Sequence, residues 1–565
     1  MAGLRKVVTA FAGVPGIIGL HGGLPPATAF PIKGVTLTLE DGKKVEIDDP
    51  IKLAAAQQYC LTTAGYAPLH EWAKRHTWQM HSPPGEHDLI ITPGNNQTIE
   101  VVMRLLMDQG DAMLCEEYTY PHIAESMVQP QGYAAIPLAM DAHGIIPGTF
   151  RTHLQSLRDA GQPLPKLLYT IPVGQNPTGA ITPLGRRREI YGICRDYNIL
   201  ILEDDPYYYL QFSTAHGGEP KGLTDLGHSY LSMDTDSRVI RLDSFSKVLA
   251  PGLRIGWVTA APKLVERIIY HMQGIHLGAN SFTQVIVSEV LNEWGPAGFD
   301  RHICSMQSEY AHRAAVIQAA AEEHLTGLAD WTKPAAGMFL WLKLLTVSDA
   351  DEILDKLKDA GVVVVPGRFS HCCGPKHVEQ SPYVRVSFAS ASHEELRQGM
   401  ERLGVTLRAA QAAQGLAGSH ASAKAATADG TASLPAFAAA AAAQPAADSD
   451  SATSQGASLP AAGQNGHASS AAQKPSGQSQ GGMENGHTGD MANGYSAGSA
   501  SNGAGGNVPG LRVDEDAGKG ARRVNPFPDG AAKVELAPGS LGVTADALAP
   551  RLAKTLDPRD SAWKH

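Results

Sequence analysis

Cysteine is scarce in this chain of 565 residues, and the six that occur are irregularly spaced, at Cys60, Cys115, Cys194, Cys304, Cys372 and Cys373. That usage excludes a disulfide framework and fits a reducing compartment. Cys372 and Cys373 stand between His371 and His377. Because adjacent cysteines lack the C-x₂₋₄-C spacing typical of zinc sites, we predict a surface loop there and no metal site.

Long hydrophobic runs and an excess of positive charge are also missing. No run of 18 apolar residues occurs, which excludes a transmembrane helix. The first 25 residues are somewhat basic and apolar but lack a clear signal-peptide cleavage pattern. The net charge of -10 argues against nucleic-acid and anionic-membrane partners, although a locally positive cleft can still take a small anionic substrate. We therefore expect a soluble protein, cytoplasmic by default, with an organelle left open.

The composition is not uniform along the chain. Up to about residue 410, apolar runs alternate with Gly, Pro and Asp turns, as in a globular protein. Beyond that point Ala, Gly, Ser, Gln and Asn dominate, and such a stretch buries too little to offset the entropy of ordering. We predict a largely disordered tail over residues 411–565. Its last part, from RRVNPFPDG onward, is less degenerate and is interpreted as a short interaction element of unknown function.

The part before residue 410 shows short apolar segments that alternate with segments of helical period. Strands are predicted at 88–94, 112–115, 166–171, 199–202, 239–243 and 253–258, and helices at 95–107 and 183–197. This pattern favours an α/β fold with a mostly parallel sheet sandwiched by helices. From about residue 290, a helix (299–323), a strand (337–343), a helix (349–359) and an alternating segment (383–388) predict a smaller α/β domain. The predicted parts are an arm (1–45), a large domain (46–290), a small domain (291–410) and the tail.

Ligands of such sheets bind beyond the carboxyl ends of the strands, so the polar residues there are the candidates for chemistry. Each candidate segment also has an ordinary interpretation: a helix cap, an Asn-Pro turn, a solvated acidic loop or an exposed lysine. Lys247, if desolvated, is able to form an imine with an aldehyde. The four segments are Gly94–Thr98, Gln175–Gly179, Glu203–Tyr207 and Ser244–Lys247, the last followed by Arg254.

In this order the segments resemble fold-type I aminotransferases of class I/II, which depend on pyridoxal 5′-phosphate (PLP). The resemblance is strongest to the kynurenine/2-aminoadipate and aromatic amino-acid group. It runs from Gly19 to Leu403 and is carried by GGLPPATAFP, ITPGNNQ, QNPTGAIT, LILEDDPYYYLQF, IRLDSFSKVLAPGLRIGW, PAAGMFLW and SPYVRVSFASAS. It implies PLP as the cofactor.

The resemblance assigns the residues around the cofactor ring. Lys247 would form the aldimine with PLP and later carry the substrate's α-proton. Asp204 would face the pyridine nitrogen, because the family pattern places an Asp three residues before a Tyr, here Tyr207, which points to Asp204 and not to Asp205. A carboxylate there keeps the ring an electron sink. Asn176 and Tyr207 would hydrogen-bond the ring oxygen O3′.

Further positions follow from the same resemblance. Tyr120, in CEEYTY, would stack on the ring. The cofactor phosphate would rest on a helix opening and side-chain donors, which are Asn95, Asn96, Ser244, Arg254 and, as a weaker candidate, Ser246. Relatives usually carry Ser or Gln where this chain has GNNQ, so the backbone contact is a firmer expectation there than the side chains of Asn95 and Asn96.

For the substrate, the resemblance implies that Arg385 grips the α-carboxylate with its planar guanidinium, beside Asn176. Gly23 would let backbone approach the substrate closely. Tyr59 resembles a residue donated to the partner subunit's site, which implies a homodimer with composite sites. Phe339 fits either the side-chain pocket or the core.

The implied reaction is a ping-pong transamination between an amino acid and a 2-oxo acid, with 2-oxoglutarate as the expected acceptor. Kynurenine, 2-aminoadipate, tryptophan, phenylalanine, tyrosine and leucine stay open as donors. The chain departs from the family in a segment after Tyr59 that is about one residue longer and in a tail without a counterpart. Its N-terminal arm is short, although Arg5 falls near a basic residue that relatives place above the substrate.

Three alternatives compete with this interpretation. Ser244–Lys247 also spells S-x-x-K, the acylating motif of penicillin-binding proteins, but no K-T-G occurs in the chain. A PLP-sensing regulator would need a basic helix-turn-helix module, and none is apparent. Another PLP reaction, such as that of a lyase, is the strongest competitor, because the reaction type depends on which substrate bond stands perpendicular to the ring.

Overall fold

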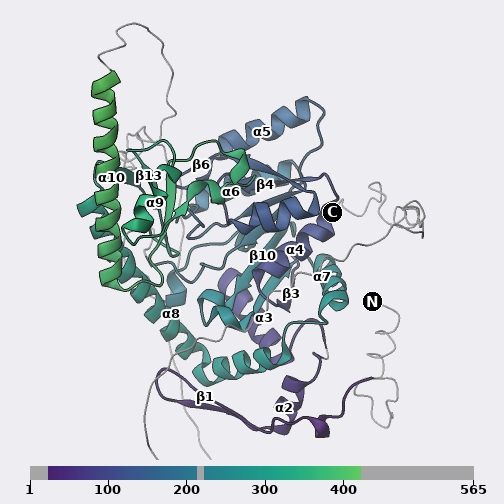
Figure 1. Ribbon diagram of the computed structural model, residues 1–565. Coiled ribbons are helices and arrows are strands. Elements are labelled where there is room, and N and C mark those ends of the chain that lie inside the picture. The colour runs from purple at the N-terminus through teal and green to yellow at the C-terminus, as the bar shows by residue number, and fades with distance from the viewer. Residues whose placement is uncertain (1–22, 61, 213–221, 422–565) are drawn as a thin grey trace, which may run out of the picture. The chain divides into compact units, whose positions relative to one another are not determined.

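A seven-stranded sheet carries the strand ends that the sequence singles out (Figure 1). The computed structural model describes residues 23–60, 62–212 and 222–421, so that Arg5 and the predicted tail from residue 422 onward lie outside the described residues. The strand order is β3-β11-β10-β9-β8-β4-β5, and only β11 runs antiparallel to its neighbours. The predicted mostly parallel sheet is confirmed. The strands are β3 (Asp88–Thr92), β4 (Ala112–Glu116), β5 (Ala134–Leu138), β8 (Leu167–Thr170), β9 (Leu200–Asp204), β10 (Val239–Ser244) and β11 (Gly256–Ala260).

Helices cover both faces of this sheet. On one face, which we call the α4 face, pack α4 (Asn95–Leu106) and α7 (Pro262–Ile275). On the other, the α6 face, pack α5 (Pro147–Asp159), α6 (Leu184–Asp196) and α3 (Ala67–His81). On β9, Leu202 packs on the α4 face and Ile201 on the α6 face. Since strand side chains alternate, Asp204 points to the α4 face, whereas Glu203 and Asp205 point to the α6 face.

A second, four-stranded antiparallel sheet has the order β12-β13-β15-β14. Its strands are β12 (Ala329–Trp331), β13 (Phe339–Leu344), β14 (Val365–Pro366) and β15 (Tyr383–Ser387). It shares a core with α9 (Asp351–Asp359), α10 (His393–Ala421) and the second half of α8 (Ser281–Leu325). This region matches the predicted helix–strand order of the smaller α/β domain. The helix α10 runs past residue 410, where the sequence places the start of the tail.

The long helix α8 crosses residue 290, where the sequence places the boundary between the two domains. The helix is kinked at Gly295, whose φ of 58° is left-handed, and Pro296 follows. One bent helix therefore contributes to both regions: its first half packs on α2 (Pro50–Gln57), and its second half packs under the smaller sheet. Ahead of α2 stands a hairpin of β1 (Val35–Thr38) and β2 (Lys44–Ile47).

The helix α2 begins with a side-chain cap. Asp49 caps it, accepting hydrogen bonds from the backbone N–H groups of Ile51 and Lys52, and Pro50 fills the first helical position, where no N–H partner is needed. None of the helices within the described ranges combines the length and apolar character that crossing a membrane requires.

Candidate active site

The side chain of Asp204 is buried at the carboxyl end of β9, and uncharged donors hold both of its oxygens. The Asn95 amide, from the first turn of α4, donates to Oδ1 at 2.7 Å, and the Tyr169 hydroxyl, from β8, donates to Oδ2 at 2.7 Å. Burial raises the pKa of Asp204, and these two hydrogen bonds oppose that rise. In the described part of the chain, Asp204 forms no ion pair. Its charge is stabilised but not neutralised.

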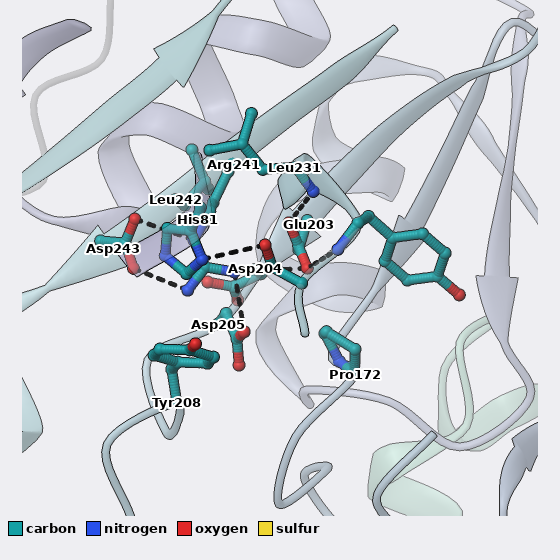
Figure 2. A network of polar contacts seen from close by, with 12 residues as sticks. His81, Pro172, Glu203, Asp204, Asp205, Tyr208, Leu231, Arg241, Leu242 and Asp243 are labelled. Carbon is teal, nitrogen blue, oxygen red and sulfur yellow. Dashed lines mark hydrogen bonds and ion pairs between the residues drawn. The ribbon is translucent and has the colours of Figure 1, made fainter. Parts of the chain in front are cut away.

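A buried charge cluster lies on the opposite face of the sheet, the α6 face, at the ends of β9 and β10 (Figure 2). The Arg241 guanidinium, from β10, is 2.9 Å from Asp205, 3.3 Å from Glu203 and 2.8 Å from Asp243. It also lies 4.7 Å from the centre of the Tyr208 ring. Burial alone would lower the pKa of Arg241, but the three carboxylates outweigh burial and raise it. Arg241 therefore stays charged and forms ion pairs with the three carboxylates on the α6 face.

The predicted imine-forming residue ends a short 3₁₀ turn, Phe245–Lys247, directly after β10. Ser244 caps this turn, because its hydroxyl oxygen accepts a hydrogen bond from the Ser246 N–H at 3.0 Å. Desolvation lowers the pKa of Lys247, and the positive charge of Arg254 lowers it further. A lowered pKa leaves more of the amine neutral and nucleophilic near neutral pH.

Arg254 and the start of α4 form a cradle for an anion. Arg254 donates to the Ser246 hydroxyl at 3.3 Å, and its own φ of 51° follows a turn at Pro251–Leu253. That turn delays β11 to Gly256, so the predicted start at residue 253 was three residues too early. Gly94 has a φ of 104°, and a Cβ on it would come within 2.6 Å of the Arg254 guanidinium. Glycine thus lets the guanidinium lie over the helix start, whose first N–H groups have no intrahelical partners.

A second arginine approaches from the smaller sheet. Arg385, on β15, donates from Nη1 to the Asn176 side-chain oxygen at 2.8 Å, and Asn176 also hydrogen-bonds Tyr207. The Arg385 Nε is buried and has no partner among the described residues. Phe339 lies beside both, with its ring centre 4.5 Å from the guanidinium and 6.0 Å from the Tyr207 ring. These four side chains therefore form a contiguous group with an unused hydrogen-bond donor.

Tyr120 links these parts of the site. Its hydroxyl accepts a hydrogen bond from the Asn96 amide at 3.3 Å. Burial raises the pKa of Tyr120, and the charges of Asp204, Arg254 and Arg385 also act on it. The structure thus brings together all but two of the described residues that the sequence singled out.

Those two residues are Tyr59 and Gly23. Tyr59 is 57% exposed and lines a separate pocket of about 440 Å³ together with Cys60, His276 and Asn280. Gly23 is exposed, and a Cβ on it would meet no atom within 4 Å. Within the described chain, neither contacts the group around Asp204. Arg5, the third residue of this kind, lies outside the described residues.

Three important residues were missed from sequence. Tyr169 holds Asp204, Arg241 anchors the opposite face, and Glu116, fully buried, accepts hydrogen bonds from Thr170 at 2.7 Å and Gln175 at 2.9 Å. Burial raises the pKa of Glu116 to about 7, against the effect of those hydrogen bonds. A signal was present in each case, because all three are polar residues inside otherwise apolar strand segments (LLYT, VIRL and AMLCE).

The prediction of a surface loop at Cys372 and Cys373 was wrong for Cys372, which is fully buried. The physical reason is a pairing of backbones. The Thr119 N–H donates to the Ser370 carbonyl at 2.7 Å, and the Cys372 N–H donates to the Glu117 carbonyl at 2.9 Å. This pairing draws the Cys372 side chain into the core of the α4 face, on Cys115.

A mostly parallel sheet with a lysine after one strand and a buried carboxylate after the next defines the fold-type I class of PLP-dependent enzymes. The chain belongs to the family described as aminotransferase class I and II, which it matches over residues 36–403. It is a PLP-dependent aminotransferase.

Named relatives agree with this assignment. The chain is 37% identical to the mitochondrial kynurenine/alpha-aminoadipate aminotransferase of Bos taurus, over 68% of this chain and 91% of that one. A solved aromatic aminotransferase of Candida albicans superimposes with a TM-score of 0.66 at 28% identity, covering 71% and 93% of the two chains. A kynurenine aminotransferase of Pyrococcus horikoshii, solved in complex with PMP, KYN and KYA, gives a TM-score of 0.57 at 28% identity, covering 63% and 83%.

Proposed function

We propose that this aminotransferase moves the amino group of an aromatic, kynurenine or 2-aminoadipate type of amino acid to a 2-oxo acid, 2-oxoglutarate, by a ping-pong mechanism at Lys247. The donor class is supported by the names of the relatives. The observation that carries the assignment of the site is the buried Asp204, which only uncharged groups hold, at the end of β9, the strand next to the one that leads to Lys247, an amine of lowered pKa.

The residues present fit the cofactor by their chemistry. A phosphate dianion matches Arg254, Ser244, Ser246 and the free N–H groups at the start of α4, which Gly94, with its φ of 104°, leads into beside the guanidinium. A protonated ring nitrogen matches the unpaired charge of Asp204. When bound, the cofactor supplies an electron sink for the charge that develops at the substrate α-carbon.

The protein's own groups then have defined tasks. The neutral Lys247 amine holds the cofactor and later accepts the proton from the substrate α-carbon. Asp204 keeps the proton on the ring nitrogen, and Asn95 and Tyr169 keep Asp204 ionised. Asn176 and Tyr207, already hydrogen-bonded to each other, are placed to hold the ring oxygen, while Tyr120 is placed to cover the ring face.

Arg385 accounts for the use of one site by two substrates. Amino acid and oxo acid share an α-carboxylate. While Nη1 of Arg385 binds Asn176, the buried, partnerless Nε and the adjacent Nη2 form the edge of the guanidinium that would grip this carboxylate with two hydrogen bonds. Phe339 lies against this guanidinium and offers an apolar surface to an aromatic or aliphatic substrate side chain.

We propose that the active protein is a homodimer. Tyr59 and Ile275 are both 57% exposed, and Leu277 is 45% exposed, around the pocket that Tyr59 lines. A second copy that covers this surface would bring Tyr59 to its partner's site. Sedimentation velocity of the purified chain tests this proposal: a monomer at micromolar concentration with full activity would contradict it.

The first experiment on function is the visible absorption spectrum of the purified chain and of Lys247→Ala, before and after addition of amino acids. We expect an absorption band in the wild type that changes with donor and is restored by 2-oxoglutarate, and no such cycle in the variant. Formation of an oxo acid from each donor separates transamination from a lyase reaction, which would release a side-chain fragment. Failure of every donor class to yield its oxo acid would overturn the proposal.

A further inference from the structure

Three soft-metal ligands converge where the loop after β14 meets the segment after β4. The ligand atoms of His371, Cys372 and Cys373 all lie within 4.8 Å of one another, and the two sulfur atoms are 3.9 Å apart. A fourth thiol, Cys115 on β4, contacts Cys372 from the core beneath. None of these four residues belongs to the site around Asp204 and Lys247.

The spacing of the two sulfur atoms is compatible with coordination of one zinc ion. With Zn–S bonds of about 2.3 Å, two thiolates at a tetrahedral angle stand roughly 3.8 Å apart. The observed 3.9 Å between Cys372 and Cys373 agrees with this separation before any metal is bound. The sequence argument against a metal rested on the missing C-x₂₋₄-C spacing. The chain turns at these residues, where the Gly374 N–H donates to the His371 carbonyl at 2.8 Å, and the two adjacent sulfur atoms lie on the same side of the turn, 3.9 Å apart.

The surroundings also favour a cation. Glu117 is half-buried beside the cluster, and no positively charged group of the described chain forms an ion pair with it. Cys372 is buried, while His371 and Cys373 are partly exposed. An ion can therefore enter from solvent past His371 and Cys373. Cys372 is the ligand that is shielded from water.

We propose that His371, Cys372 and Cys373 bind a zinc-class divalent ion. Binding replaces the thiol protons: each thiol that coordinates becomes a thiolate and releases one proton to solvent, and no electrons are transferred. The ion would fasten residues 370–373 to residues 117–119, directly before Tyr120. The site is thus a structural clamp beside the cofactor pocket and not part of its chemistry.

Metal retention by the full chain tests the proposal. The protein is reduced, loaded with Zn²⁺ or Co²⁺, dialysed and analysed by elemental mass spectrometry and absorption spectroscopy. We expect about one ion per chain, and for Co²⁺ the sulfur-to-metal charge-transfer band and the visible bands of a tetrahedral complex. His371→Asn and Cys373→Ser change partly exposed residues, and each should weaken binding by more than about 10-fold, the loss typical even of residues that only orient ligands.

Cys304→Ser is the matched control, because Cys304 lies on α8, away from the cluster, and is also a partly buried free thiol. Circular dichroism of each metal-free variant separates loss of ligands from loss of fold. Two results would overturn the proposal: a folded wild type that retains no ion, or equal retention by the wild type, His371→Asn and Cys373→Ser. A cobalt complex without the charge-transfer band would also count against it, since the ion would then be held by histidines elsewhere.

Discussion

Two neighbouring carboxylates, Asp204 and Asp205, have opposite surroundings. Asp205 faces the α6 face and is paired with Arg241, whereas Asp204 faces the α4 face and is held by an amide and a hydroxyl. Burial raises the pKa of both. Strand alternation separates them, although they are adjacent in sequence. The paired Asp205 therefore stabilises the fold, whereas the unpaired Asp204 is available to bind a ligand.

The largest effect is expected on the structural side of this comparison. Arg241→Met would leave Glu203, Asp205 and Asp243 buried without a counter-charge. We expect the free energy of unfolding to fall by about 3–5 kcal/mol, as for other broken buried ion pairs. Denaturant unfolding measures it, with Arg151→Met as the control, because the Arg151–Asp196 pair is exposed and should contribute about 0–1 kcal/mol. Similar losses of unfolding free energy in the two variants would show that the buried Arg241 cluster does not stabilise the fold more than an exposed ion pair does.

The functional side is tested by Asp204→Asn. The substitution keeps the shape but removes the charge that matches a protonated ring nitrogen, so we expect kcat to fall on the order of 10²–10³-fold. The amide loses one acceptor oxygen, which costs stability, but it also removes a buried charge without an ionic partner, so we expect a smaller net change in the free energy of unfolding than for Asp205→Asn. Asp205→Asn is the matched control and should show the reverse: lost stability with kcat retained in the folded fraction. Equal effects on kcat would contradict the assignment of Asp204.

Tyr169→Phe sharpens the comparison by removing one of the two uncharged donors. A hydrogen bond to a charged group contributes about 1.5–3 kcal/mol, so we expect a loss in kcat of roughly tenfold or more. The Tyr169 hydroxyl lowers the pKa of Asp204, so its loss raises that pKa further. Asp204 then becomes protonated at a higher pH, and the acid limb of the kcat profile should move upward. An unchanged acid limb would show that Tyr169 does not control this carboxylate.

The smallest predicted effect is a displacement in pH. Arg254→Gln removes the positive charge that, after burial, lowers the pKa of Lys247. The pKa should rise, the neutral fraction of the amine should fall at any given pH, and the acid limb for cofactor capture by the apoprotein should move to higher pH. Stopped-flow absorption over a pH series measures the midpoint. The amplitude of the absorption change also drops, because the phosphate site loses a hydrogen-bond donor. Only the pH midpoint therefore reports the pKa of Lys247.

Much of the site could be predicted because its residues end strands in recognisable order. The mostly parallel sheet, Lys247 after β10 and the acidic segment after β9 were all predicted from local pattern and resemblance. Tyr169 and Arg241 stand out in the sequence only as polar residues in apolar segments. Their roles could not be predicted, because they depend on the neighbouring strand β9, which holds Asp204 and Glu203. The burial of Cys372 likewise depends on the pairing of residues 370–372 with 117–119, which are far apart in the sequence.

The absence of an ionic partner for Asp204 has a consequence for the stability of the protein in a cell. A buried anion without a counter-charge makes the cofactor-free form less stable than the same fold with its ligand. Any ligand that binds only the native state adds stability in proportion to the logarithm of its free concentration. The survival of newly made chains should therefore follow the supply of pyridoxal phosphate, and vitamin shortage would reduce the amount of this enzyme as well as its turnover.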